Sequence, residues 1–185
     1  MPNEKQIIQD CIKQDRSAQK QFYELYSGKL FVVALRYMRD RENAQDVLQD
    51  SFIKIFKHLD TFRFDSPLEA WLRKIVVNTA LKALKKDKKL TQSLEGDYML
   101  NEEYQYTNLG FEKLSYEHLM KMIGELPEGC RTIFNLYAIE GFKHQEIAKM
   151  LDVSEGTSKS QYSRAKSLLQ DKLEIENNRV TTEKI

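Results

Sequence analysis

Residues 144–172 most restrict what this chain of 185 residues can fold into. Their apolar members recur at helical spacing in two groups, Ile147, Ala148 and Leu151, then Tyr162, Ala165 and Leu169. Between the groups, Asp152 tolerates the left-handed backbone of a sharp turn, and Ser154 suits the N-cap of a second helix. The stretch is therefore predicted to be a helix-turn-helix, a motif that places its second helix in the major groove of DNA.

The second predicted helix carries polar and basic side chains that can donate hydrogen bonds to phosphates or base edges. They are Thr157, Lys159, Ser160, Gln161, Ser163, Arg164 and Lys166. Lys159 and Arg164 can both bind guanine edges, so they are the candidates for reading bases. An ordinary helical hairpin with a solvated polar face is the alternative that this stretch alone leaves open.

Composition favours a folded, helical protein. Hydrophobic residues make up 41% of the chain and charged residues 31%, with only seven glycines and three prolines. No apolar run is long enough to span a bilayer, and the polar first ten residues are unlike a secretory signal. Cys11 and Cys130 lie on apolar helical faces, as in proteins of a reducing cytoplasm. We therefore expect a cytoplasmic protein without membrane insertion, and no residue spacing predicts a metal or a cofactor.

Charge is distributed unevenly, although the net charge is only +1. Residues 1–90 and 156–172 are basic, whereas residues 91–130 are acidic. Two basic surfaces separated by an acidic connector indicate two contacts with a polyanion. Chance clustering of charges on solvated helix faces is the alternative.

Helical periodicity extends over most of the chain. Ahead of the helix-turn-helix, the predicted helices cover about residues 5–12, 18–38, 42–59, 66–84, 114–123 and 128–137. In the first helix, the positions expected to face inward are Ile7, Ile8, Cys11 and Ile12. The fourth helix has a clear start signal, with Ser66 as N-cap, Pro67 at the first helical position and Glu69 to close a capping box. Residues 90–111 lack periodicity and are predicted to be a mobile linker.

A loop at residues 60–66 combines two aromatics, an arginine and several hydrogen-bonding side chains. Trp71 lies one turn into the next helix, and cations and an amide follow it at Arg73, Lys74, Asn78, Lys82, Lys85 and Lys86. Aromatic faces stack on single-stranded bases and cations bind the backbone, so this segment is predicted to bind nucleic acid, including a base taken out of the duplex. The alternative is that Phe62 and Trp71 are core residues.

Four motifs, in family order and at family spacing, make the chain similar to bacterial sigma factors of the extracytoplasmic-function (ECF) group of the sigma-70 family. They are AQDVLQDSFIKIF at 44–56, TFRFDSPLEAWLRKIVVNTAL at 61–81, LPEGCRTIFNLYAIEGFKHQEIAKML at 126–151 and SEGTSKSQYSRAK at 154–166. The resemblance implies an all-α protein with two small helical domains, sigma domain 2 and sigma domain 4, joined by a flexible linker. The implied boundaries are 1–89 for domain 2, 90–112 for the linker, 113–175 for domain 4 and 176–185 for a polar tail.

The resemblance also implies a function without catalytic chemistry. Such a factor binds core RNA polymerase, directs it to the −35 and −10 elements of promoters and assists DNA melting. Domain 2 is expected to contact the β′ coiled coil and domain 4 the β flap. Promoter DNA and an anti-sigma factor are the other implied partners.

Position by position, the resemblance assigns roles to residues of both domains. The segment that docks on core polymerase matches Asp46, Gln49, Asp50, Phe52 and Lys54. The −10 contacts match Thr61, Phe62, Arg63, Phe64, Asp65 and Ser66 of the loop and Trp71, Arg73, Lys74, Asn78 and Lys82 of the next helix. The −35 contacts match Thr157, Lys159, Ser160, Ser163 and Arg164, with Lys166 nearer the rim of the same surface.

Four positions depart from the family pattern. Phe64 and Asp152 stand where glycine is common, which puts the shape of the loop pocket in question at Phe64. Ser158 and Gln161 stand where valine and arginine are common, so Ser158 is expected to weaken a packing position and Gln161 to change the bases that are read.

Two other hypotheses remain open at the level of the sequence. A stand-alone helix-turn-helix regulator binds duplex DNA without polymerase. A helical adaptor, whose basic faces only confer solubility, shows no salt-dependent binding of nucleic acid.

Overall fold

The computed structural model describes residues 4–38, 40–86, 92, 94 and 116–182. It divides into two compact units, residues 1–86 and 87–185. Within the described residues, every regular element is a helix and none is a strand. The predicted all-α class with two small helical domains is therefore confirmed.

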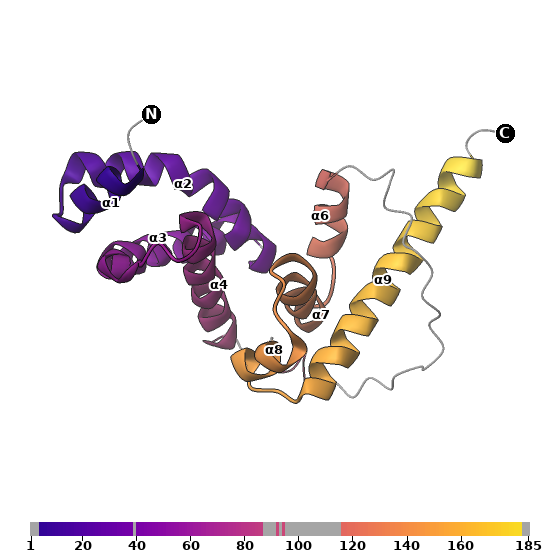
Figure 1. Ribbon diagram of the computed structural model, residues 1–185. Coiled ribbons are helices and arrows are strands. Elements are labelled where there is room, and N and C mark those ends of the chain that lie inside the picture. The colour runs from indigo at the N-terminus through magenta and orange to yellow at the C-terminus, as the bar shows by residue number, and fades with distance from the viewer. Residues whose placement is uncertain (1–3, 39, 87–91, 93, 95–115, 183–185) are drawn as a thin grey trace. The chain divides into compact units, whose positions relative to one another are not determined.

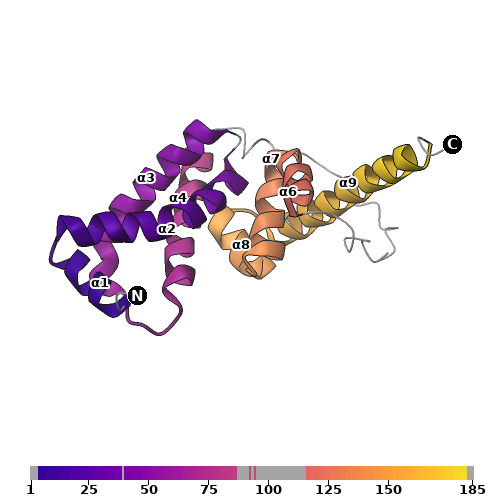
Figure 2. The same cartoon turned by 90° about the horizontal axis from the view of Figure 1, so that it is seen from above.

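The first unit contains helices α1 (Glu4–Ile12), α2 (Arg16–Tyr37), α3 (Arg41–His58) and α4 (Leu68–Lys86), with a 3-10 turn at Leu59–Thr61 (Figure 1). Asp15 caps α2 by accepting a hydrogen bond from the backbone N–H of Ala18 at 2.8 Å. Asp40 caps α3 in the same way through Asn43, also at 2.8 Å. Helices α2, α3 and α4 pack against one another and α1 packs on α2, as Figure 2 shows from above.

Large side chains fill the core of the first unit, and those that are fully buried include Phe22, Tyr37, Ile55, Leu59 and Leu72. In α1, Ile7, Ile8 and Cys11 are buried as predicted. The inward position predicted for Ile12 is wrong, because this side chain is 43% exposed. Ile12 is the last residue of α1, and the chain turns away at Gln14, whose φ is 63°.

Helix α4 begins one residue later than predicted. The carbonyl of Pro67 accepts hydrogen bonds from the N–H groups of Ala70 and Trp71, so Pro67, and not Ser66, occupies the N-cap position. Glu69, which was expected to close a capping box, instead forms an ion pair with Lys29 of α2. The start signal therefore predicts the helix correctly and its first residue incorrectly.

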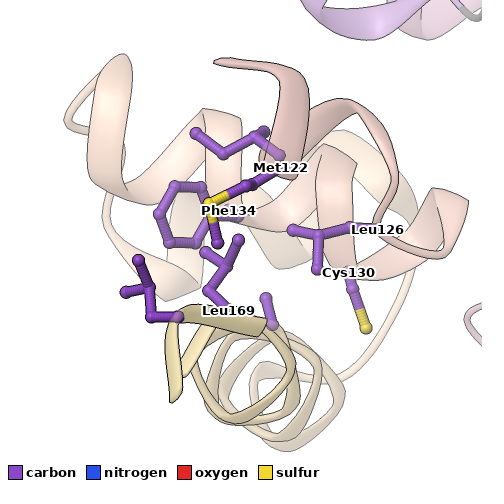
Figure 3. Packing of buried hydrophobic residues seen from close by; sticks show 8 residues of the cluster. Met122, Leu126, Cys130, Phe134 and Leu169 are labelled. Carbon is purple, nitrogen blue, oxygen red and sulfur yellow. The ribbon is translucent and has the colours of Figure 1, made fainter. Parts of the chain in front are cut away.

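The second unit contains α6 (Tyr116–Gly124), α7 (Glu128–Phe134), a π-helical turn (Asn135–Ile139), α8 (His144–Leu151) and α9 (Glu155–Thr182). The helix predicted at 128–137 is α-helical only to Phe134, where the backbone widens into the π-helical turn. The core of the second unit consists of side chains of α6, α7 and α9, among them Met122, Leu126, Cys130, Phe134 and Leu169 (Figure 3).

The helix-turn-helix follows the local chemistry of its turn. Asp152 ends α8 in the left-handed conformation, with φ 60° and ψ 49°. The hydroxyl of Ser154 then accepts a hydrogen bond from the N–H of Thr157 at 2.9 Å, as an N-cap does. Ala165 and Leu169 are fully buried, which confirms the predicted inner face of the second helix.

The predicted linker at 90–112 lies almost wholly outside the described residues, which include only Gln92 and Leu94 of this range. Helix α9 continues to Thr182, so most of the predicted tail at 176–185 has a helical backbone. The four predicted domain ranges remain predictions.

Candidate nucleic-acid and protein interfaces

One face of α3 carries three of the five residues matched to polymerase docking. Asp46, Gln49 and Asp50 are exposed and lie three and four residues apart, so they share this face. Phe52 is only 4% exposed and packs its ring against Tyr23, with centroids 4.6 Å apart. Lys54 is half-buried, and its Nζ donates a hydrogen bond to Thr79 of α4 at 3.0 Å. Phe52 and Lys54 therefore hold α3 in place on its neighbours.

Sequence reasoning missed the most exposed apolar side chain of this helix. Ile53 is 67% exposed and lies seven residues after Asp46, so it falls between Gln49 and Asp50 on the same face. A large apolar residue surrounded by polar residues on a surface is typical of a protein contact. An apolar residue within a helical sequence is ordinarily taken for core, so only its exposure identifies it.

The loop before α4 holds two aromatics in different environments. Phe62 is 8% exposed and lies between the rings of Phe64 and Trp71, at centroid distances of 4.8 and 5.5 Å. Phe64 is 45% exposed and adopts a φ of 59°. For a bulky residue this left-handed conformation costs roughly 1–3 kcal/mol relative to ordinary backbone. A glycine avoids that cost, which gives a physical reason for glycine being common at this position.

The other loop residues remain near the surface. Arg63, Asp65 and Ser66 are exposed. Thr61 is also exposed, and its hydroxyl donates to the carbonyl of His58 at 2.7 Å, which ties the start of the loop to the end of α3. The loop is thus anchored by Thr61 and Phe62 and presents the remaining side chains.

A row of side chains on α4 extends from the aromatic cluster. Trp71 is half-buried, and Lys74, Asn78 and Lys82 are exposed at positions three, seven and eleven residues beyond it, on one helical face. Arg73 is exposed but points about 200° around the helix from Trp71. The structure therefore brings two lysines and an amide together with the tryptophan, and leaves Arg73 on another face.

Helix α9 contains polar residues on its buried side as well as on its exposed side. Ser158 is fully buried, and its Oγ lies 2.8 Å from His144 Nδ1 in a hydrogen bond. Gln161 is 2% exposed, and its Oε1 accepts a hydrogen bond from the thiol of Cys130 at 3.0 Å. The Gln161 side chain therefore belongs to the core of the unit, and the expectation that this position changes which bases are read stays a prediction.

The exposed side of α9 has its own internal contacts. The Nζ of Lys159 lies 2.7 Å from a carboxylate oxygen of Glu155, and this hydrogen bond lowers the pKa of Glu155. The hydroxyl of Ser160 donates to the carbonyl of Thr157 at 3.1 Å, and Ser163 is half-buried. Lys159 remains exposed in this pair, and its ammonium group has three donors, so it can also bind a phosphate or a base.

Arg164 and Lys166 lie toward the edges of this side. Burial raises the pKa of the Cys130 thiol to about 11, and the positive charge of the half-buried Arg164 opposes this shift. Lys166 holds its Nζ 5.2 Å from the centroid of the Tyr162 ring. Arg164 therefore lies close to the core, and Lys166 packs along the flank of the helix.

Candidate membrane spans and clusters of metal ligands are both absent from the described ranges. No helix in them is long and apolar enough to cross a membrane. Nor do three or more His, Cys, Asp or Glu side chains gather there as ligands for a metal ion.

Comparisons with known proteins agree with this geometry. The family models for sigma-70 region 2 and sigma-70 region 4 match residues 22–90 and 116–169. The RNA polymerase sigma-H factor of Pseudomonas aeruginosa is 30% identical over 183 residues, which cover 92% of this chain and 94% of that protein. The ECF RNA polymerase sigma-E factor of Escherichia coli is 29% identical over 178 residues, with 91% and 93% covered.

A solved structure is similar along most of the chain as well. It is the sigma factor RpoE in complex with the anti-sigma factor NepR from Bartonella quintana, with a TM-score of 0.51 and 26% identity. The match covers 84% of this chain and 96% of that chain.

The two matched regions and the helical fold define a transcription initiation factor. The chain belongs to the sigma-70 family, as a sigma factor of the ECF group. It binds core RNA polymerase and promoter DNA and directs promoter-specific initiation of transcription.

Proposed function

We propose that three surfaces of the described residues carry out this function. The exposed face of α3 docks on the β′ coiled coil of core polymerase, the loop and α4 bind the −10 element, and α9 reads the −35 element. The single observation that carries the proposal is the α3 face, where Ile53 stands exposed among Asp46, Gln49 and Asp50. Such a face is compatible with water, and a partner that is basic and partly apolar complements both its charge and its apolar area.

The electrostatics of α3 favour a basic partner. Asp46 and Asp50 lie one turn apart and repel each other mildly, so a cation from the partner would relieve this repulsion. Ile53 adds apolar area at the centre of the same face. Phe52 and Lys54 support the face from within the unit and do not contact the partner directly.

For the −10 element, the exposed members of the loop and the row on α4 bind the displaced strand. Trp71 offers part of its ring for stacking, and Lys74 and Lys82 bind the backbone. Thr61, Arg63, Asp65 and Ser66 surround a base taken out of the stack. Phe62, which is buried, supports the rings on both sides of it. Arg73 contributes less, because it lies on another face of α4.

For the −35 element, Lys159, Ser160 and Ser163 form the centre of the contact, because they lie on the side of α9 opposite Ala165. Thr157 and Lys166 contact the phosphate backbone at its edges. Arg164 is positioned to support the unit beside Cys130, with at most its exposed part available to DNA. The same unit also binds the β flap of the polymerase.

An anti-sigma factor is a further proposed partner. Support comes from RpoE of Bartonella quintana, which was solved in complex with the anti-sigma factor NepR. We propose in addition that the chain acts in the cytoplasm, where core polymerase is found, and that it has no catalytic chemistry and needs no cofactor.

Transcription with purified core polymerase tests the proposed function. Reactions with and without the chain are run on genomic DNA, and the RNA 5′ ends are sequenced. We expect a new set of 5′ ends that share two upstream sequence elements. A set of 5′ ends that does not change when the chain is added would contradict the proposal.

A further inference from the structure

The backbone of Phe64 adopts a left-handed conformation, which is unfavourable for a residue with a bulky side chain. Its φ of 59° is one that glycine, asparagine or aspartate adopts more easily, and its ring is nevertheless 45% exposed. Only part of the ring packs, against Phe62 at a centroid distance of 4.8 Å. The strained backbone therefore holds a large, flat ring with nearly half of its residue surface accessible at the edge of the loop.

A cation from a different element lies over this ring. Lys5 of α1 places its Nζ 5.5 Å from the centroid of Phe64. Helix α1 is fixed on the unit, since Ile7 and Ile8 are buried and Glu4 accepts a hydrogen bond from the hydroxyl of Tyr26 at 3.2 Å. The loop thus has a lysine held beside its exposed aromatic by a helix outside the segment matched by the sigma-70 region 2 model.

An exposed aromatic face with an adjacent cation is the chemistry that binds one nucleotide of single-stranded nucleic acid, since the ring stacks on any base and the cation binds a phosphate. Lys5 is exposed, and its ammonium group has three hydrogen-bond donors, so it can bind a phosphate beside the ring. The ring also continues the row of Phe62 and Trp71 toward α4.

We propose that Phe64 and Lys5 form a second nucleotide site beside the base-binding loop. There, one further base of the displaced −10 strand stacks on Phe64, and its phosphate binds Lys5. This inference rests on the proposed −10 function. It adds α1 to the DNA-binding surface and gives the strained phenylalanine a role that glycine cannot perform.

An abasic scan of the displaced strand tests the stacking half of the site. The probe is a single-stranded oligonucleotide with the non-template −10 sequence of a promoter mapped by RNA 5′ ends, in which each base in turn is removed. It is bound to holoenzyme that contains the wild-type chain, Phe64→Gly or Phe64→Tyr. In the wild type, we expect the loss of one base next to the extruded base to weaken binding roughly tenfold.

In Phe64→Gly, removal of that same base should have no further effect, whereas removal of the extruded base should remain costly. Phe64→Tyr, which keeps the ring, should retain the wild-type profile. Thermal melting checks the fold of each variant, and glycine fits the backbone conformation at this position without strain.

The salt dependence of binding tests the phosphate half. Loss of one phosphate contact to a single strand lowers the slope of log K against log salt by about 0.7. Lys5→Ala should show this decrease. Lys13→Ala is the matched control, because Lys13 is exposed directly after α1 and pairs with Asp10 at 3.5 Å. Its slope should equal that of the wild type.

The outcomes separate this inference from the function on which it rests. If wild-type holoenzyme does not bind the intact oligonucleotide, the proposed −10 function and the second site are both overturned. If wild-type holoenzyme binds, the second site alone is overturned by an unchanged abasic profile in Phe64→Gly or by an unchanged salt slope in Lys5→Ala.

Discussion

The polar residues of α3 and those of α9 differ in where they lie. On α3, Asp46, Gln49 and Asp50 are all exposed on one face, and an exposed isoleucine lies among them. On α9, Ser158 and Gln161 are buried and bonded inside the unit, although the sequence around them is equally polar. The comparison shows that a polar residue in an interface helix is a candidate contact only once its burial is known.

The difference has a physical origin in the neighbours of each helix. A buried polar group is tolerated where another element supplies a hydrogen-bond partner, as α7 does for Gln161 and α8 for Ser158. The polar groups on the exposed face of α3 need no such partner in the protein, because they form hydrogen bonds with water. Variants on the two helices should therefore separate loss of binding from loss of stability.

Asp50→Arg is expected to have the largest effect, on the affinity for core polymerase. Reversal of the charge places a cation against a basic partner, and like charges in an interface cost several kcal/mol, about a hundredfold or more in affinity. Binding to core polymerase is measured without DNA, and thermal melting should show an intact fold. Asp171→Arg on α9 is the same substitution at another exposed position. A core affinity of Asp50→Arg equal to that of the wild type would remove the α3 face from the docking surface.

The second largest expected effect is a loss of stability of the second unit in Gln161→Ala. The substitution removes the acceptor of the Cys130 thiol and leaves a cavity, with an expected cost of about 1–3 kcal/mol in the free energy of unfolding. Ser163→Ala, on the exposed side of the same helix, should change stability little and −35 binding more. Denaturant unfolding and binding to a −35 library distinguish the two. A stable Gln161→Ala variant with altered base preference would return Gln161 to the DNA surface.

Ile53→Ala should weaken core binding more modestly than Asp50→Arg. The lost apolar contact is worth about 1 kcal/mol, or about fivefold in affinity. Since Ile53 is 67% exposed, the melting temperature should not fall. The matched control is Ile175→Ala, the same substitution at a side chain that is 53% exposed on α9. If both variants bind core polymerase like the wild type, Ile53 is a solvated surface residue.

The smallest expected effect is a pH dependence contributed by His144. Burial, and then the charge of Lys159, lower the pKa of His144 from 6.5, whereas Glu155 opposes the shift. The unfolded chain therefore binds the proton more tightly than the folded chain. The contribution of neutral His144 to the free energy of unfolding is fully present above pH 6.5 and is lost as pH falls below it. Stability of wild type and His144→Gln is compared between about pH 8 and pH 5. The wild type should lose more stability toward acid, and parallel curves would contradict the assignment.

Local chemistry made much of the fold predictable. Asp152 and Ser154 were expected to form the turn and the N-cap, and both do so, because the interactions involved lie within a few residues of each other. The start of α4 was predicted to within one residue, since the proline fixes the backbone there. Helical periodicity predicted most of the helices, and the resemblance to ECF sigma factors implied the all-α class with two domains.

Tertiary contacts explain what could not be predicted. Gln161 meets Cys130 across 31 positions of the chain, and no local pattern announces that contact. The exposure of Ile53 could not be predicted, because helical periodicity does not tell which apolar positions remain uncovered. The proximity of Lys5 to Phe64 likewise depends on how α1 packs.

The most direct test of the account is binding of one promoter fragment by the chain alone, by core polymerase alone and by the two together. The fragment comes from a promoter mapped by RNA 5′ ends and carries both the −35 and the −10 elements. We predict stable, sequence-specific binding only when both proteins are present. Equally tight and specific binding by the chain alone would contradict the account and identify a stand-alone regulator of duplex DNA.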